Sequence, residues 1–320
     1  MRRLMTESSG AIRIEEVDTR IPAVDEAVVS VGFKEKIAAY VALTKPRIIE
    51  LLLVTTVPSM IVAARGFPSM KLVLWTLLGG TLGAGGANAI NCYVDRDIDE
   101  VMPRTRKRPL PMHRIAPRNA LLFGIALGVI AFLQLWATVN LLSAVLTIAA
   151  LLFYVFVYTI GMKRSTPQNI VIGGAAGAVP ALVGWAAVTG TVELAALVLF
   201  AIIFYWTPPH FWALSMRYEK DYAAAGVPMM PVVYGRKETA KHMLLYCFML
   251  FAMCLAFFGV AKMGPIYLAS ALALNGIFIW WSYKLYRKPT TRSAWGMFRF
   301  SIYYLALLFL AMAVDQLIAI

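Results

Sequence analysis

Residues 83–111, GAGGANAINCYVDRDIDEVMPRTRKRPLP, end an apolar segment with a regular series of polar side chains. Asn91, Asp95 and Asp99 are spaced four residues apart, and a basic run follows at 104–108. On a helix, steps of four residues place these three side chains on one face, about 6 Å apart along the axis. The stretch therefore predicts a row of oxygen ligands at a helix end, followed by a group of cations.

Carboxylate and amide oxygens suit Mg²⁺, which takes hard oxygen ligands and often shares its coordination shell with substrate phosphates. The basic residues would contact the same phosphates through charge-assisted hydrogen bonds. The alternative is that these charges are merely solvated at a membrane surface. Because spacing, ligand type and the basic run agree, we predict that Asn91, Asp95 and Asp99 bind the metal and that Arg104 and Arg108 bind substrate.

The composition places this row in a membrane protein. Apolar residues make up 60% of the 320 residues and charged residues only 15%, whereas soluble proteins have about a quarter charged. The apolar segments lie near residues 47–64, 72–94, 119–138, 141–161, 169–190, 194–214, 243–261, 265–286 and 298–319. We therefore expect an all-α polytopic bundle of about nine transmembrane helices, each long enough for a hydrocarbon core of about 30 Å.

Charge orients this bundle. Of the 30 Lys and Arg residues, all except Arg65, Lys71 and Lys262 fall on one side. Since Lys and Arg collect on the cytoplasmic side, the amino terminus and the ligand row are expected there. Residues 1–30 are predicted to be a disordered cytoplasmic tail, and residues 31–320 the membrane domain. The net charge of +13 follows from this sidedness and requires no nucleic-acid partner.

Two further local features have alternative explanations. Residues 31–46 mix apolar and lysine side chains, which predicts a short helix on the membrane surface or the lead-in to the first span. Glycines gather at 79–86 and 173–184. Small residues let helices approach closely in lipid, and we prefer this explanation to a phosphate-binding loop.

A second charged cluster follows the sixth predicted span. Residues 218–221, YEKD, repeat the order aromatic, acid, base, acid of residues 93–97. The repetition falls four spans later on the same side, as a weak internal repeat of a helical bundle would require. Lys163 and Arg164 lie on a loop between the two clusters and are predicted to complete a basic rim.

His210 follows Pro208 and Pro209 near the cytoplasmic end of the sixth span. Ionisable residues inside a membrane are candidate functional residues by default. Its imidazole could ligate haem iron, transfer a proton or form a structural hydrogen bond within the bundle, and the sequence leaves these roles open.

The NxxxDxxxD motif, the number of spans and the second acidic cluster resemble the UbiA-type intramembrane aromatic prenyltransferase superfamily. More narrowly, five blocks resemble its protoheme IX farnesyltransferase (haem O synthase) branch. They are LTKPRIIELLLVTT (43–56), NCYVDRDIDEVMPRTRKRPLP (91–111), KRSTPQNIVIGGAAGAVPALVGW (163–185), WTPPHFWAL (206–214) and DYAAAGVPMMPVV (221–233). The resemblance implies Mg²⁺-dependent transfer of farnesyl from farnesyl diphosphate to the 2-vinyl group of haem B, with addition of water, giving haem O for haem–copper oxidases. It also implies a bacterial cytoplasmic (inner) membrane location and haem A synthase as a partner.

The resemblance further implies roles for individual residues. The implied catalytic residues are Asn91, Asp95, Asp99, Lys163, Lys220 and Asp221. The implied substrate-binding residues are Arg104, Arg108, Arg164, His210, Arg217 and Tyr218. The second cluster departs from the DxxxD pattern of many superfamily members, because Arg217 and Ala225 flank Asp221 at those offsets. A second metal is therefore left open, and Arg217 and Lys220 become candidates for binding diphosphate oxygens.

Two other functions compete with this one. A prenyltransferase acting on a quinone or chlorin precursor would share the metal site and differ in its acceptor. A transporter of about nine spans is the alternative from another class, but transport sites typically lie near the bilayer midplane, whereas these acids are predicted at one membrane edge. Metal-dependent release of diphosphate distinguishes an enzyme from a transporter.

Overall fold

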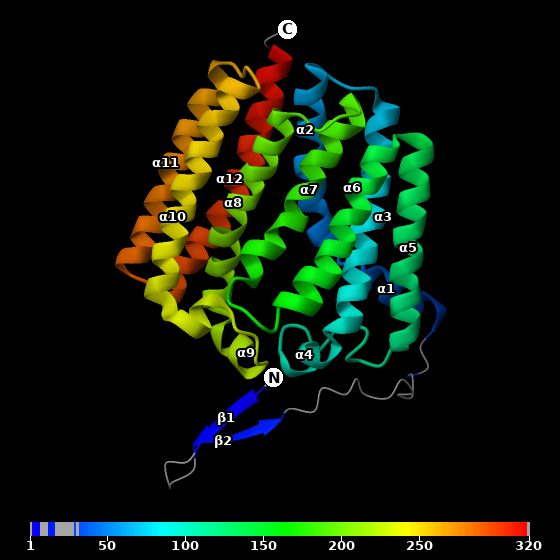
Figure 1. The fold of residues 1–320 in the computed structure, drawn as a ribbon, viewed down its shortest axis with the longest axis vertical. Coiled ribbons are helices and arrows are strands. Elements are labelled where there is room, and N and C mark those ends of the chain that lie inside the picture. The colour runs from blue at the N-terminus through cyan, green and yellow to red at the C-terminus, as the bar shows by residue number, and fades with distance from the viewer. Residues whose placement is uncertain (1, 7–11, 17–28, 30–31, 319–320) are drawn as a thin grey trace.

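The computed structural model describes residues 2–6, 12–16, 29 and 32–318, and nearly all of these are helical (Figure 1). In chain order the elements are β1 (Arg2–Thr6), β2 (Ile12–Glu16), α1 (Phe33–Leu43), α2 (Pro46–Ala64), α3 (Met70–Val94), α4 (Arg96–Val101), α5 (Pro117–Thr138), α6 (Leu141–Leu152), the π-helix η1 (Phe153–Met162), α7 (Asn169–Thr189), α8 (Leu194–Arg217), α9 (Glu219–Ala224), α10 (Met230–Val260), α11 (Pro265–Arg287) and α12 (Thr291–Ile318).

The long helices form one bundle. Seven of the described helices are long and apolar enough to cross a membrane, namely α5, α6 with η1, α7, α8, α10, α11 and α12. The helices α2 and α3 lie beside them in the bundle (Figure 1). The 25-residue helix α3 is long enough for a span, but its Gly and Asn residues reduce its hydropathy. The all-α fold is thus confirmed for the membrane region. The chain is an integral membrane protein with seven candidate spans among its described helices.

The amino-terminal segment contains two described strands. β1 pairs antiparallel with β2, with Arg2 opposite Glu16 and Thr6 opposite Ile12. The structure therefore describes paired strands at 2–6 and 12–16, where the composition predicted no regular structure. The rest of the predicted tail, apart from residue 29, lies outside the described residues, and its boundary near residue 30 stays a prediction.

The glycines permit close helix packing, as predicted, but each group has its own partners. A Cβ atom added to Gly86 of α3 would lie 2.7 Å from the backbone oxygen of Gly124 in α5. In α7, a Cβ atom at Gly174 would meet Thr207 of α8, and one at Gly184 would meet Thr56 of α2. Since backbone atoms cannot move aside as a side chain can, Gly86 fixes the distance between α3 and α5 and so helps to position the end of α3.

Replacing Gly86 by alanine should destabilise the bundle by about 1–3 kcal/mol, because the methyl group would overlap the α5 backbone. The expected result is a lower unfolding temperature of the purified protein in detergent. Gly80→Ala is the matched control on the same helix, since no atom lies within 4 Å of its added Cβ. Equal unfolding temperatures for the two variants would contradict this account of the packing.

Both polar clusters lie at one end of the bundle. The six-residue helices α4 and α9 follow α3 and α8 and are found at the end where β1 and β2 lie, whereas α12 finishes at the opposite end (Figure 1). Each is separated from the preceding long helix by one non-helical residue, Asp95 for α4 and Tyr218 for α9. The two sequence clusters thus share a local structure as well as an order of residue types.

Candidate active site

The predicted ligand row lies where α3 passes into α4. Asp95 interrupts the helix, yet its amide donates to Asn91 O at 2.9 Å and the Asp99 amide donates to Asp95 O at 2.8 Å. The helical spacing therefore continues through the break. All three side chains are buried, with exposures of 2% for Asn91, 0% for Asp95 and 3% for Asp99. Asn91 Nδ2 donates to Asp95 Oδ2 at 2.6 Å, which confirms that these two share a face.

Cations from two other segments contact the carboxylates of the row. Lys163, just after η1, contacts Asp95 Oδ2. Arg108 Nη1 donates to Asp99 Oδ1 and Oδ2 at 2.8 and 2.7 Å. Burial disfavours both cations, but the facing carboxylates outweigh it and raise the pKa of Lys163 and the pKa of Arg108. Both side chains therefore remain charged beside the row.

Arg164 completes the basic rim that the sequence predicts. It donates to the two Asp97 oxygens at 2.6 and 2.7 Å, and these hydrogen bonds raise the pKa of Arg164. They also lower the pKa of Asp97, despite partial burial of that carboxyl group. Its Nη2 lies 3.7 Å from Asp95 Oδ1, so Arg164 faces the row without donating a hydrogen bond to it.

The π-helix η1 brings a residue to the row that sequence reasoning missed. Thr159 is fully buried, its Oγ accepts from Asn91 Nδ2 at 3.2 Å, and it donates to Tyr154 O at 2.8 Å. The i to i−5 pattern continues to Lys163, whose amide donates to Tyr158 O at 2.8 Å. π-helical turns are rare and frequent at functional sites. Nothing in the sequence indicated this register.

Lys45 is the second residue that sequence reasoning missed. It lies between α1 and α2, and its Nζ donates to Asn91 Oδ1 at 2.6 Å. Burial lowers the pKa of Lys45 from its ordinary value. The available signal was its position in LTKPR, directly before the first span and on the same predicted side as the row.

A cation–π contact connects the second cluster to the first. The Arg104 guanidinium lies 5.4 Å from the centre of the Tyr218 ring, a cation–π distance. Arg217 instead lies over Trp295 at 4.3 Å. Lys220 is exposed and Asp221 is half-buried, and neither side chain forms a hydrogen bond or ion pair with another described residue. The structure therefore brings Arg104 and Tyr218 together, while Lys220 and Asp221 have no contact with the row.

His210 has structural contacts inside the bundle. It is buried at 7% exposure and stacks on Trp206 with 4.3 Å between ring centres. Its Nδ1 lies 2.7 Å from Ser301 Oγ, which itself donates to Phe298 O at 2.6 Å. Because the Ser301 hydroxyl already donates to Phe298 O, we infer that His210 Nδ1 carries a proton and donates to Ser301 Oγ. These contacts favour the structural alternative, and a role in binding haem stays a prediction.

The row has the donor set and the free atom that a metal needs. Asp95 Oδ1 is buried and accepts no hydrogen bond, although a buried carboxylate oxygen normally has a partner. Among the described residues, no three His, Cys, Asp or Glu side chains are arranged so that they could hold a metal ion by themselves. A metal here would therefore rest on two carboxylates and the Asn91 amide, with water or substrate oxygens completing its shell, and Mg²⁺ accepts such a shell.

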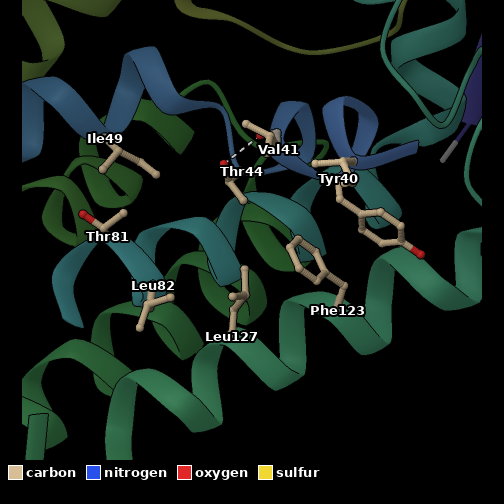
Figure 2. Close-up of a pocket in the computed structure, with 9 residues that line it drawn as sticks. Tyr40, Val41, Thr44, Ile49, Thr81, Leu82, Phe123 and Leu127 are labelled. Atoms are coloured by element: carbon tan, nitrogen blue, oxygen red, sulfur yellow. Dashed lines mark hydrogen bonds between the residues drawn. The ribbon is translucent and has the colours of Figure 1, made fainter. Parts of the chain in front are cut away.

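A cavity of about 320 Å³ adjoins the corner between α1 and α2 (Figure 2). Tyr40 and Phe123 pack edge to face in its wall, with ring centres 5.0 Å apart. Thr44, the residue before Lys45, donates to Val41 O at 2.8 Å. The remaining lining residues are Ile37, Ile49, Thr81, Leu82 and Leu127. The lining of this cavity is largely apolar.

Sequence comparisons identify the family. The sequence profile of the UbiA prenyltransferase family matches residues 52–312. A protoheme IX farnesyltransferase from Frankia casuarinae is 52% identical over 286 residues, covering 88% of this chain and 99% of the relative. One from Roseiflexus sp. is 49% identical over 297 residues, covering 93% of this chain. The chain spans only 56% of that second relative's length.

Solved structures share the fold. A digeranylgeranylglyceryl phosphate synthase superposes with a TM-score of 0.74 at 18% identity, covering 88% of this chain and 99% of its own. A UbiA homologue from Archaeoglobus fulgidus, solved with DMAPP and Mg²⁺, gives a TM-score of 0.62 at 17% identity, covering 86% of this chain and 99% of its own. Fold, ligand row and profile match agree: the chain belongs to the UbiA prenyltransferase family.

Proposed function

We propose that this chain transfers farnesyl from farnesyl diphosphate to the 2-vinyl group of haem B, with addition of water, and so forms haem O. The observation that carries the proposal is the buried row of Asn91, Asp95 and Asp99 beside Lys163 and Arg108. Relatives about half identical to the chain are protoheme IX farnesyltransferases, which supports haem and a prenyl diphosphate as the substrates.

The oxygen atoms of Asn91, Asp95 and Asp99 would hold Mg²⁺ together with the diphosphate. When bound, the metal supplies Lewis-acid stabilisation of the leaving diphosphate. Asp95 Oδ1 accepts no hydrogen bond and so offers a ligand atom that needs no hydrogen bond to break, although Arg164 lies 3.7 Å away. Both oxygens of Asp99 accept from Arg108, so that guanidinium would exchange part of this ion pair for the diphosphate. A metal-dependent prenyltransferase fits this donor set.

Cations beside the row stabilise the leaving group. As the bond between C1 of farnesyl and the diphosphate oxygen breaks, its electron pair leaves with the diphosphate. Lys163, Arg108 and Arg164 surround the row, so positive charge is already in place where negative charge develops. Preorganised charge of this kind is usually the largest single contribution to a rate enhancement.

The allylic farnesyl cation then accepts the vinyl group of haem. A carbon–carbon bond forms between C1 of farnesyl and the terminal vinyl carbon, leaving a cation on the carbon next to the macrocycle. Water adds to that carbon and loses a proton. The products are haem O, diphosphate and one proton, which balances farnesyl diphosphate, haem B and water.

The second cluster would also bind substrate. Arg104 and Tyr218 already connect the two clusters, and we assign Arg217, Lys220 and Asp221 to diphosphate or acceptor binding from α9 and the end of α8. The side chains of Lys220 and Asp221 have no partner among the described residues that such binding would displace. His210 is assigned to haem contact through its unprotonated Nε2, the nitrogen that does not face Ser301.

The membrane arrangement is proposed to have about nine crossings, with α2 and α3 added to the seven candidate spans. An odd number of crossings fits the positions of the amino-terminal strands and the end of α12 at opposite ends of the bundle (Figure 1). The positive-inside rule then places the row at the cytoplasmic face of a bacterial inner membrane. Haem A synthase, which would use haem O, is the proposed partner, and residues 31–320 the catalytic domain.

The test is a product assay. Membranes containing the protein, supplied with haem B, farnesyl diphosphate and Mg²⁺, should form a haem whose mass has increased by one farnesyl group and one hydroxyl group. Prenylation of a quinone or chlorin precursor with haem unchanged would favour the other acceptor. No release of diphosphate with any acceptor would favour the transporter. Membranes with the same protein but no farnesyl diphosphate provide the control.

A further inference from the structure

Lys45 occupies an unusual corner of the chain. Its backbone has φ 54° and ψ 62°, the left-handed region that side-chain-bearing residues seldom adopt, directly before Pro46. Residues before proline normally adopt extended conformations. Unfavoured backbone conformations of this kind persist where the surrounding structure holds them, often at functional sites. The exposed Lys34 and Lys36 on α1 show that lysines of this segment otherwise lie at the surface.

The side chain of Lys45 ends on the ligand row. Nζ donates to Asn91 Oδ1 at 2.6 Å. The amide cannot be turned around, because Asn91 Nδ2 donates to both Asp95 Oδ2 at 2.6 Å and Thr159 Oγ at 3.2 Å. Asn91 therefore presents its oxygen to Lys45. The preceding residue, Thr44, lines the largely apolar cavity (Figure 2).

Lys45 differs from the other cations of the site in its partner. Lys163 faces a carboxylate on Asp95, Arg108 one on Asp99, and Arg164 one on Asp97. Lys45 contacts only a neutral amide, and no carboxylate among the described residues lies within ion-pair distance of it. Partly buried charges normally have a partner of opposite sign. The missing partner is thus expected to be an anion that arrives from outside the chain.

The charges that contact the row indicate which anion is expected to bind Lys45. The hydrogen bonds and ion pairs around the row involve four cations, Lys45, Arg108, Lys163 and Arg164, and three carboxylates, Asp95, Asp97 and Asp99. The net charge of this set is +1, and its unmatched charge is that of Lys45. A divalent metal together with a diphosphate of about three negative charges would bring the set to neutrality. A monoanionic headgroup with the same metal would leave it strongly positive.

We propose that Lys45 is a further substrate-binding residue of this site, whose ammonium leaves the Asn91 amide and binds the diphosphate of the prenyl substrate. The inference rests on the proposed function. The corner between α1 and α2 thereby gains a role in binding substrate. The same movement frees Asn91 Oδ1 for the metal, so Lys45 couples occupation of the amide oxygen to binding of the diphosphate.

Inorganic diphosphate with Mg²⁺ is the probe, and its Kd for the purified protein is the readout. Lys45→Gln keeps an N–H donor for Asn91 but loses the charge, and it should raise the Kd about 10- to 100-fold, as loss of a hydrogen bond to a charged group does. Lys45→Arg should remain within about fivefold of the native protein, since it keeps the charge. Lys36→Met, at an exposed lysine of α1, should leave the Kd unchanged.

The outcomes separate the two proposals. If Lys45→Gln is folded, as shown by its elution and unfolding temperature, and binds diphosphate as the native protein does, Lys45 only holds Asn91 and the inference is overturned. If the native protein itself binds no diphosphate with Mg²⁺, the proposed function fails. If the Lys45→Gln variant does not fold, chemical acylation of lysines in the native protein takes its place as the test. Diphosphate with Mg²⁺ must then protect Lys45, but not Lys36, from acylation. Equal labelling of Lys45 with and without diphosphate would overturn the inference.

Discussion

Asp95→Asn should slow release of diphosphate by about 1,000-fold or more while leaving folded protein in the membrane. The carboxylate of Asp95 is fully buried, accepts from Asn91 and Lys163, and keeps Oδ1 free of hydrogen bonds. An amide of the same shape removes one anionic ligand and the counter-ion of Lys163. Losing about 4 kcal/mol of transition-state stabilisation corresponds to this factor. The measurement is diphosphate release per mole of folded protein.

Two further variants make this result interpretable. Glu100→Gln, at an exposed acid on the short helix α4 that follows Asp95, should stay near native turnover. Adding Lys163→Met to Asp95→Asn removes the unpaired ammonium that the single variant leaves behind. If misfolding around that charge caused the loss, the double variant would recover the unfolding temperature that the single variant lacks. If a metal ligand was lost, the single variant already unfolds near the native temperature and is still inactive. Near-native turnover of Asp95→Asn would exclude Asp95 as a metal ligand.

Removal of divalent metal should stop turnover altogether, and Mg²⁺ should restore it. Four cations already face the row and its neighbour Asp97, but they are held by protein groups and cannot by themselves neutralise a departing diphosphate. Ca²⁺ should restore less activity than Mg²⁺, because it prefers longer bonds and more ligands than two carboxylates and one amide provide. Diphosphate release after chelation and re-addition of each metal is the measurement.

The unfolding temperature serves as the control for chelation. No metal is needed to hold α3 and α4 in place, since Lys163 and Arg108 pair with the row, so the chelated protein should unfold near the native temperature. A chelated protein that is still fully active would contradict the assignment of Asn91, Asp95 and Asp99 as metal ligands.

The sequence predicted the secondary structure of the membrane region closely. The predicted span at 169–190 is α7 at Asn169–Thr189, and the one at 265–286 is α11 at Pro265–Arg287. The burial of Asn91 and Asp95 on a shared helix face also agrees with the prediction. These properties depend on hydropathy and helical spacing, which act between residues a few positions apart and can therefore be read along the chain.

Which residues meet in the site depends on contacts between distant parts of the sequence, and no local pattern predicts them. Lys45 reaches Asn91 across 46 positions of sequence, and Lys163 reaches Asp95 across 68. The sequence nominated Lys163 as part of a basic rim but offered no residue for it to contact. Lys220 and Asp221 were nominated by the same kind of reasoning, and the structure leaves them without a contact to the row. A charge pattern predicts which residues are available for a site but not which of them meet.

The sequence by itself determined that this protein is a helical membrane bundle with a row of amide and carboxylate side chains at one end. The tertiary structure alone decided what surrounds that row. The π-helical register of η1 turns Thr159 and Lys163 toward Asn91 and Asp95, and the left-handed corner at Lys45 directs a cation to the amide oxygen. Both are backbone conformations of low intrinsic preference, so they arise only because packing of the whole bundle stabilises them.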